Sequence, residues 1–187
     1  MDGQFVPPIT FGAPIVRAIR DSTSLLIDVH MMAIDPSKHF DELAQAGANS
    51  ITVHYEALTD VFENLKQLEY LGLRRSLAIR PGTEIHSLYP ILESLDQVLI
   101  MSVEPGYGGQ KFIPRTIEKI SELRREISKQ GLSVEIQVDG GINVDTISDV
   151  VKAGIDIAVV GSALYNDSIN VEEGLKAILQ AAEGNQD

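Results

Sequence analysis

The sequence contains no cysteine and no tryptophan, and only 5% of its 187 residues are aromatic. Without cysteine, disulfide scaffolds, cysteine-based zinc sites and thiol nucleophiles are excluded. The same absence fits a reducing compartment, so we expect a cytoplasmic protein. No run of about 18 apolar residues occurs, so we expect neither a membrane-spanning helix nor a membrane partner. The first residues have neither the basic nor the apolar region of a secretory signal peptide.

Positive charge is also scarce. The chain has 15 Lys and Arg against 27 Asp and Glu, which gives a formal net charge of −12. Such a surface repels the phosphate backbone of nucleic acids and anionic lipids, so we expect no nucleic-acid partner. Apolar residues make up 44% of the chain, enough for a sizeable core. At this length we expect residues 1–187 to form a single domain.

Six short runs are nearly continuously apolar, which is typical of strands buried on both faces of a parallel sheet. Amphipathic patterns typical of helices lie before the first run and after each run. This alternation predicts an α/β fold with a parallel sheet, either a barrel or a doubly wound sheet. The predicted strands are Ser24–Met32, Ser50–His54, Ser76–Ile79, Gln97–Val103, Val134–Asp139 and Ile157–Val160. The predicted helices are Pro14–Arg20, Asp41–Ala46, Thr59–Gly72, Glu84–Leu95 (shortened or kinked at Pro90), Thr116–Gly131, Asp145–Gly154 and Val171–Ala182, and the tail Glu183–Asp187 is expected to fray.

In such folds the functional residues lie at the carboxyl ends of the strands. Two glycine-containing pairs follow the last two predicted strands, Gly140-Gly141 and Gly161-Ser162. Glycine lets backbone N–H groups approach an anion closely, so the pairs favour a phosphate site, the alternative being ordinary turns. The segment Glu104–Gln110 carries three glycines, which suits a loop that covers a ligand or a flexible surface loop.

Two side chains at strand ends suggest a metal. Asp139 ends an apolar strand, where a carboxylate must be paired, hydrogen-bonded or metal-bound, or else caps the next loop. His30 ends another, and the two form a plausible nitrogen and oxygen donor pair. Asp28 shares a strand face with His30, so it is either a further ligand or a carboxylate in a barrel interior. The role of His54 is left open, and His39 and His86 are interpreted as solvent-exposed.

Seven segments, in this order, resemble the ribulose-phosphate 3-epimerase family over essentially the whole chain. The most specific are MSVEPGYGGQKFIP and VDGG, and the others are MDGQFVPPITFG, LLIDVHMM, ITVHYEA, LAIRPGT and VVGSALY. The resemblance implies a TIM (β/α)8-barrel that interconverts D-ribulose 5-phosphate and D-xylulose 5-phosphate. It also implies a divalent metal, most commonly zinc and otherwise iron, manganese or cobalt, that stabilises an enediolate. Two aspartates on opposite faces of C3 would then exchange the proton.

Carried over to this sequence, the resemblance assigns Asp139 as one catalytic aspartate and a metal ligand, and His30 as a ligand that also touches substrate. It assigns Gly106, Tyr107, Gly108 and Gly109 to the loop over the substrate, and Gly140, Gly141, Gly161 and Ser162 to the phosphate. Methionine side chains more often fill the core than line a site. The resemblance nevertheless assigns Met32 and Met101 to the lining of the pocket.

The family pattern also contains a second metal-binding histidine and the other catalytic aspartate, both upstream of the position matched by Met1. We therefore expect about two strands and one helix of the barrel to be missing from this chain. The chain alone is then expected to be impaired in two-base epimerisation. Strands left with open edges predict a homo-oligomer or an unstable monomer. Two other functions stay open: epimerisation of another ketose phosphate such as allulose 6-phosphate, and a non-catalytic phosphosugar-binding module.

Overall fold

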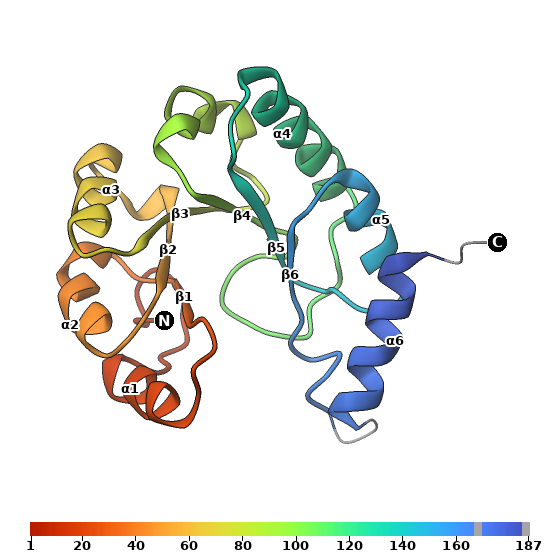
Figure 1. Ribbon diagram of the computed structural model, residues 1–187, viewed down its shortest axis with the longest axis horizontal. Coiled ribbons are helices and arrows are strands. Elements are labelled where there is room, and N and C mark those ends of the chain that lie inside the picture. Colours follow the sequence, from red (N-terminus) through yellow and green to blue (C-terminus); the bar gives the residue numbers. More distant parts are fainter. Residues whose placement is uncertain (167–169, 185–187) are drawn as a thin grey trace.

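The computed structural model describes residues 1–166 and 170–184. Its centre is one parallel sheet in which the six strands stand in sequence order. The strands are β1 (Asp28–Met31), β2 (Ser50–His54), β3 (Arg74–Ile79), β4 (Gln97–Met101), β5 (Glu135–Asp139) and β6 (Ile157–Val159). The sheet is curled, and the helices follow one another around its outer face in a ring that is open between the first and the last helix (Figure 1).

The helices are α1 (Ala13–Ser22), α2 (Phe40–Gln45), α3 (Val61–Tyr70), α4 (Thr116–Gln130), α5 (Ile147–Ala153) and α6 (Val171–Glu183). Three 3₁₀ helices complete the described elements: η1 (Pro36–His39), η2 (Tyr55–Ala57) and η3 (Ile85–Ser94). No helix of the described residues is long and apolar enough to cross a membrane. Glu183 ends α6, and the last three residues of the expected frayed tail lie outside the described residues.

The core lies between the sheet and the helices, as continuously apolar strands require. All residues of β2 and β4 are buried. The apolar side of the amphipathic pattern predicted over Thr116–Gly131 faces this core in α4, because Ile120, Leu123 and Ile127 are buried on the same side of the helix. Gly131 ends α4 in the left-handed conformation that glycine favours. The sequence therefore predicted both the burial and the end of this helix correctly.

Most of the predicted bounds shift by a residue or more in the structure, as three elements illustrate. The first strand begins only at Asp28, and Leu25 and Leu26 before it are exposed. The segment around Pro90 forms a 3₁₀ helix rather than an α-helix, because proline has no N–H for the α-helical hydrogen bond. Helix α5 begins at Ile147 rather than Asp145, after a turn in which Asp145 N–H donates to Asn143 Oδ1.

Polar side chains fill part of the inner face of the curled sheet. Thr52 Oγ1 donates to one oxygen of Asp28 at 3.1 Å, while the amides of Gln97 and Gln137 donate to the other at 3.3 and 3.2 Å. These partners come from β2, β4 and β5, so the sheet curls far enough to bring β1 opposite β5. These hydrogen bonds favour the interpretation of Asp28 as a carboxylate in the interior of a barrel-like fold.

Candidate functional site

Loops at the carboxyl ends of the strands surround a cavity of about 190 Å³. Its walls contain every residue that the sequence predicted for the site except His30. These residues are Met32, Met101, Gly106, Tyr107, Gly108, Gly109, Asp139, Gly140, Gly141, Gly161 and Ser162. Glu104 and Gln110, the ends of the glycine-containing segment, also line the cavity. The sequence did not single out the remaining lining residues, which are Met1, Val103, Ile142 and Val159.

His30 stands directly behind the cavity wall. Its Nδ1 lies 3.3 Å from Asp139 Oδ2, and both side chains are largely buried. The pair joins β1 to β5, which are not neighbours in the sheet, so the curl of the sheet creates the contact. The predicted nitrogen and oxygen donors therefore do come together.

The polar contacts continue from His30 away from the cavity. His30 Nε2 lies 3.0 Å from His54 Nε2, and His54 Nδ1 lies 3.2 Å from Glu56 Oε2. The two imidazole rings are stacked, with centroids 5.1 Å apart. Asp139, His30, His54 and Glu56 thus form an unbroken chain of ionisable groups, called the Asp139–Glu56 chain below.

Burial and hydrogen bonds set the charge states at the far end of this chain. Burial lowers the pKa of His54 more than its bond to Glu56 raises it, so the net shift is downward. Burial alone would raise the pKa of Glu56. Hydrogen bonds from His54, the Thr83 hydroxyl and the Arg80 backbone N–H outweigh it and lower the pKa to about 2. Glu56 is therefore a carboxylate at neutral pH.

The N-terminal segment covers His54. The ring of Phe5 lies 4.8 Å from the His54 ring between centroids, and the guanidinium of Arg80 lies 4.2 Å from the centre of the Phe5 ring. Arg80 Nη2 also donates to the Phe5 carbonyl at 3.2 Å. The sequence left the role of His54 open and assigned no role to Glu56, although His54 ends a buried strand and Glu56 lies two residues beyond it. Only the fold shows that they continue the contacts of His30.

Two glycines after β5 are required by space as well as by conformation. Gly140 and Gly141 both have positive φ, 123° and 64°. A Cβ on Gly140 would lie 2.5 Å from Val103 Cγ2, and one on Gly141 would lie 2.6 Å from Phe112 N. The backbone after β5 thus packs directly against the loop after β4. Ser102 fixes this approach, because its hydroxyl donates to the carbonyls of Asp139 and Gly140.

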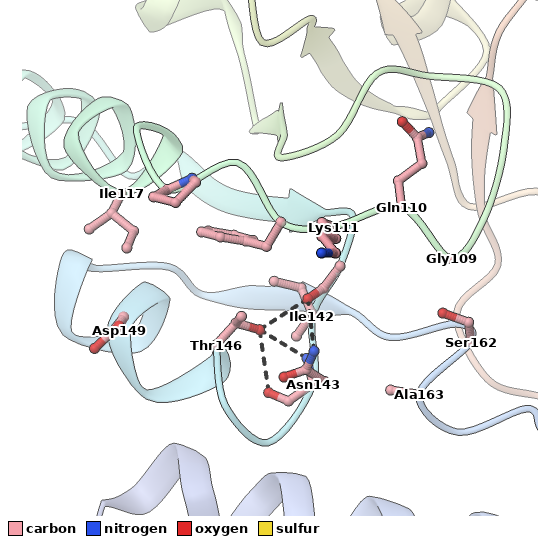
Figure 2. Close-up of a pocket in the computed structure, with 13 residues that line it drawn as sticks. Gly109, Gln110, Lys111, Ile117, Ile142, Asn143, Thr146, Asp149, Ser162 and Ala163 are labelled. Atoms are coloured by element: carbon pink, nitrogen blue, oxygen red, sulfur yellow. Dashed lines mark hydrogen bonds between the residues drawn. The ribbon is translucent and has the colours of Figure 1, made fainter.

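A larger cavity of about 590 Å³ adjoins the first and shares Gly109, Gln110, Gly141, Ile142 and Ser162 with it. Figure 2 shows Gln110 and Lys111 on the loop after β4, with Asn143 and Thr146 from the turn after β5. The Thr146 hydroxyl accepts from Asn143 N–H at 3.0 Å and donates to the Gly141 carbonyl at 3.1 Å, which fixes this turn. The cavity contains no equivalent of the His30–Asp139 pair among its lining residues.

Free backbone donors border both cavities. In the described part of the chain, the N–H groups of Gly141, Gly161 and Ser162 have no acceptor within the protein. A Cβ at position 161 would meet no atom within 4 Å, and Gly161 has no positive φ. Neither packing nor backbone conformation therefore explains why this position is a glycine. Three unpaired N–H groups at one edge suit an anion.

The residues present do not complete a metal site. Among the described residues, no group of three or more His, Asp or Glu side chains could hold a metal ion. His30 Nδ1 and Asp139 Oδ2 offer two donors, whereas catalytic zinc usually has three protein ligands. The pair therefore fits part of a ligand set and not a whole one.

Comparisons with known proteins agree on one family. The family described as "Ribulose-phosphate 3 epimerase family" matches residues 1–165. A relative from rice named "Ribulose-phosphate 3-epimerase, cytoplasmic isoform" is 37% identical over 100% of this chain and 81% of its own. Ribulose-phosphate 3-epimerases from Bacillus subtilis and Synechocystis are 39% and 42% identical; they cover 90% and 89% of this chain, which spans 78% and 73% of theirs.

Solved structures with the same fold are more distant in sequence. A 3-hexulose-6-phosphate synthase from Salmonella typhimurium has a TM-score of 0.69 at 20% identity, over 91% of this chain and 80% of its own. A tryptophan synthase α-subunit from Pyrococcus furiosus has a TM-score of 0.66 at 20% identity, over 92% of this chain and 72% of its own. These similarities show the fold alone, which is an α/β fold with TIM-barrel-like neighbours.

Proposed function

Because the chain belongs to the ribulose-phosphate 3-epimerase family, whose named members are isomerases, we propose that its smaller cavity binds a ketopentose phosphate for epimerisation at C3. One observation carries the proposal. Eleven residues that the resemblance assigns to this reaction, from the carboxyl ends of four strands and the loops that follow them, line a single cavity with Asp139 among them. We also propose a cytoplasmic location, in line with the name of the rice relative.

The phosphate of this substrate would lie where the two cavities meet. The free N–H groups of Gly141, Gly161 and Ser162 are donors for its oxygens. Local donors are needed, because the net charge of −12 repels an anion at long range. Tyr107, Gly108 and Gly109 belong to the loop that would close over the sugar.

Asp139 is the group placed to move the proton. Its carboxylate would accept the hydrogen of C3 as a proton, while the electron pair of the C–H bond moves toward C2 to form an enediolate. Inversion then needs a proton delivered to the opposite face of C3. Asp139 is the one aspartate among the described residues that line the cavity. We therefore expect residues 1–187 alone to be impaired in inversion.

The proposal includes a divalent metal, zinc by preference, for which His30 and Asp139 would supply two of the ligands. When bound, such an ion would stabilise negative charge that develops on the substrate. With two donors in the described residues, we expect the 187-residue chain to bind zinc weakly. Elemental analysis after dialysis against zinc would test this, and stoichiometric retained zinc would contradict it.

A turnover assay tests the proposed function. Residues 1–187 with ribulose 5-phosphate and added zinc should bind the sugar phosphate and form xylulose 5-phosphate at least about 100-fold more slowly than an intact relative. Failure to bind the sugar phosphate would overturn the proposed site. Activity equal to that of the intact relative would overturn only the expected impairment.

A second candidate is a phosphosugar-binding module without catalysis. Two metal donors, beside three free N–H groups for a phosphate, favour it in the described part of the chain. Binding without any exchange of the C3 hydrogen would support this candidate over the epimerase.

A further inference from the structure

The loop Glu104–Gln110, which follows β4 and lines the smaller cavity, is held by very few contacts. Among the described residues, none of its backbone N–H or carbonyl groups pairs with another backbone group. Its tip, Tyr107–Gly109, is exposed, and a Cβ added at Gly108 or Gly109 would meet no atom within 4 Å. A segment with so few partners adopts many conformations unless a side chain restricts it.

Gln110 supplies such a restriction. Its side-chain NH₂ group donates to the Glu104 carbonyl at 2.6 Å and to the Tyr107 carbonyl at 2.9 Å. An amide NH₂ group has two hydrogens, so both are used within the loop. Figure 2 shows the Gln110 side chain pointing away from Asn143 and Thr146. The amide therefore joins the last residue of the loop to its first residue and to the start of its tip.

One packing contact holds the base of the same loop. Val6 in the N-terminal segment is buried, and a Cβ on Gly106 would lie 3.3 Å from Val6 Cβ. Gly106 is also buried, whereas the three residues after it are exposed. In the described part of the chain, the Tyr107 carbonyl is the only polar atom of the tip with a hydrogen-bond partner. The tip therefore depends on Gln110.

We propose that Gln110 is a positioning residue that holds the tip Tyr107–Gly109 over the smaller cavity through its two hydrogen bonds. The proposal rests on the proposed function for the identity of the ligand beneath the loop. Gly109 and Gln110 also line the larger cavity, so the same amide keeps this end of the loop between the two cavities. Among the described residues, the Gln110 amide makes no hydrogen bond to the Asp139–Glu56 chain, so its replacement leaves the acid–base groups in place.

The loop and the phosphate donors would contact different parts of a bound sugar phosphate. The proposed phosphate donors are the N–H groups of Gly141, Gly161 and Ser162, which lie outside the loop. The tip of the loop would instead cover the sugar. Loss of the Gln110 hydrogen bonds should therefore weaken the binding of a sugar phosphate and leave the binding of inorganic phosphate nearly unchanged. A general loss of structure would weaken both alike.

Gln110→Met tests this difference, because methionine is unbranched and uncharged like glutamine but cannot donate a hydrogen bond. A typical hydrogen bond changes an equilibrium by about 2- to 12-fold. With two bonds lost, the affinity for ribulose 5-phosphate in titration calorimetry should fall by about 10-fold. The affinity for inorganic phosphate should change by less than about 2-fold, the effect of one weak hydrogen bond. Equal losses for the two ligands would overturn the proposal.

A second measurement needs no ligand. The ¹H–¹⁵N NOE of a backbone amide reports motion on the picosecond-to-nanosecond timescale and falls where a segment is flexible. In wild type, Gly108 and Gly109 should have NOE values close to those of Gly131 and Gly154, which end α4 and α5. In Gln110→Met, the values of Gly108 and Gly109 should fall while those of the two helix ends stay the same.

Gln130→Met is the matched control. The side-chain NH₂ group of Gln130 donates to Glu126 Oε1 at 2.9 Å on the surface of α4, so this variant makes the same chemical change on another element. It should leave both affinities and the NOE values of the loop unchanged.

A tip that is already flexible in wild type, or that stays rigid in a folded Gln110→Met variant, would overturn the proposal. The wild-type spectrum decides the first point even if the variant does not fold. A wild-type chain that does not bind the sugar phosphate would overturn the proposed function, and the NOE values would still decide the role of Gln110.

Discussion

At the scale of single residues, the removal of the C3 proton by Asp139 can be tested separately from the inversion of configuration at C3. If one base remains, the chain with added zinc should exchange the C3 hydrogen of one epimer with solvent deuterium while forming little of the other epimer. Asp139→Asn should slow this exchange by about 10²–10⁴-fold, because general acid–base catalysis contributes factors of that size. Mass spectrometry of the sugar phosphate in D₂O measures both quantities.

The control for Asp139→Asn is Asp149→Asn. Asp149 is exposed and lines only the neighbouring cavity, so its variant should exchange hydrogen at the wild-type rate. Equal rates in wild type and Asp139→Asn would show that Asp139 does not take the proton.

Glu56 predicts how stability depends on pH. Its pKa is lowered from 4.5 to about 2 in the folded protein. Its carboxylate therefore contributes stability above about pH 4.5, and this contribution is lost as the pH falls toward 2. The full shift corresponds to at most about 3 kcal/mol, and partial exposure to solvent reduces it. Urea unfolding between pH 2 and 6 should therefore show the stability of wild type converging on that of Glu56→Gln as the pH falls.

For this stability series Glu42→Gln serves as the control. Glu42 also contacts a histidine, His39, but its carboxylate is exposed and contributes little. Its difference from wild type should stay small at every pH. Parallel curves for wild type and Glu56→Gln would contradict the assigned pKa.

Single residues also show where sequence reasoning ends. Asp139 and His30 were predictable because each ends an apolar strand, where an ionisable group is costly without a partner. Their contact depends on the curl of the sheet. Glu56 was missed because its partners, Thr83 and the Arg80 backbone, come from the loop after the next strand. Nothing in the local pattern distinguishes it from an ordinary surface glutamate.

At the scale of elements, the turn after β5 should tolerate no side chain. Gly140→Ala would place Cβ 2.5 Å from Val103 Cγ2 and 2.9 Å from Val103 N, at a φ of 123°. Overpacking and backbone strain of this kind cost about 1–3 kcal/mol each. Thermal unfolding should therefore show a clear loss of stability.

Gly161→Ala makes the same change after β6, where no atom lies within 4 Å of the new Cβ. Its stability should stay within about 0.5 kcal/mol of wild type. Equal losses in the two variants would contradict the close packing of the β5 turn against the loop after β4.

The elements themselves were largely predictable. Ser50–His54 and the start of α4 at Thr116 match the expected bounds, because burial and amphipathic periodicity are local properties. The first strand was predicted too long because Leu25 and Leu26 are apolar yet exposed. Apolarity in a sequence indicates burial only when some other part of the structure covers the residue.

At the scale of the whole molecule, apolar side chains are exposed at both ends of the curled sheet. Leu25 and Leu26 precede β1, and Val171, Leu175 and Leu179 form one stripe along α6. In the described sheet β1 and β6 each have one neighbouring strand, so each leaves an unpaired edge. Exposed edges and apolar stripes favour association.

We therefore expect residues 1–187 to associate with a second copy, and the net charge of −12 should oppose it at low salt. Because salt screens this repulsion and leaves apolar contacts intact, the mass measured by light scattering should increase with salt and protein concentration. Leu175→Glu with Leu179→Glu should shift the protein toward the monomer. Tyr70→Gln, which alters an exposed aromatic side chain on α3, should not. A monomer under all conditions would contradict association, and an oligomer that weakens with salt would contradict the apolar contact.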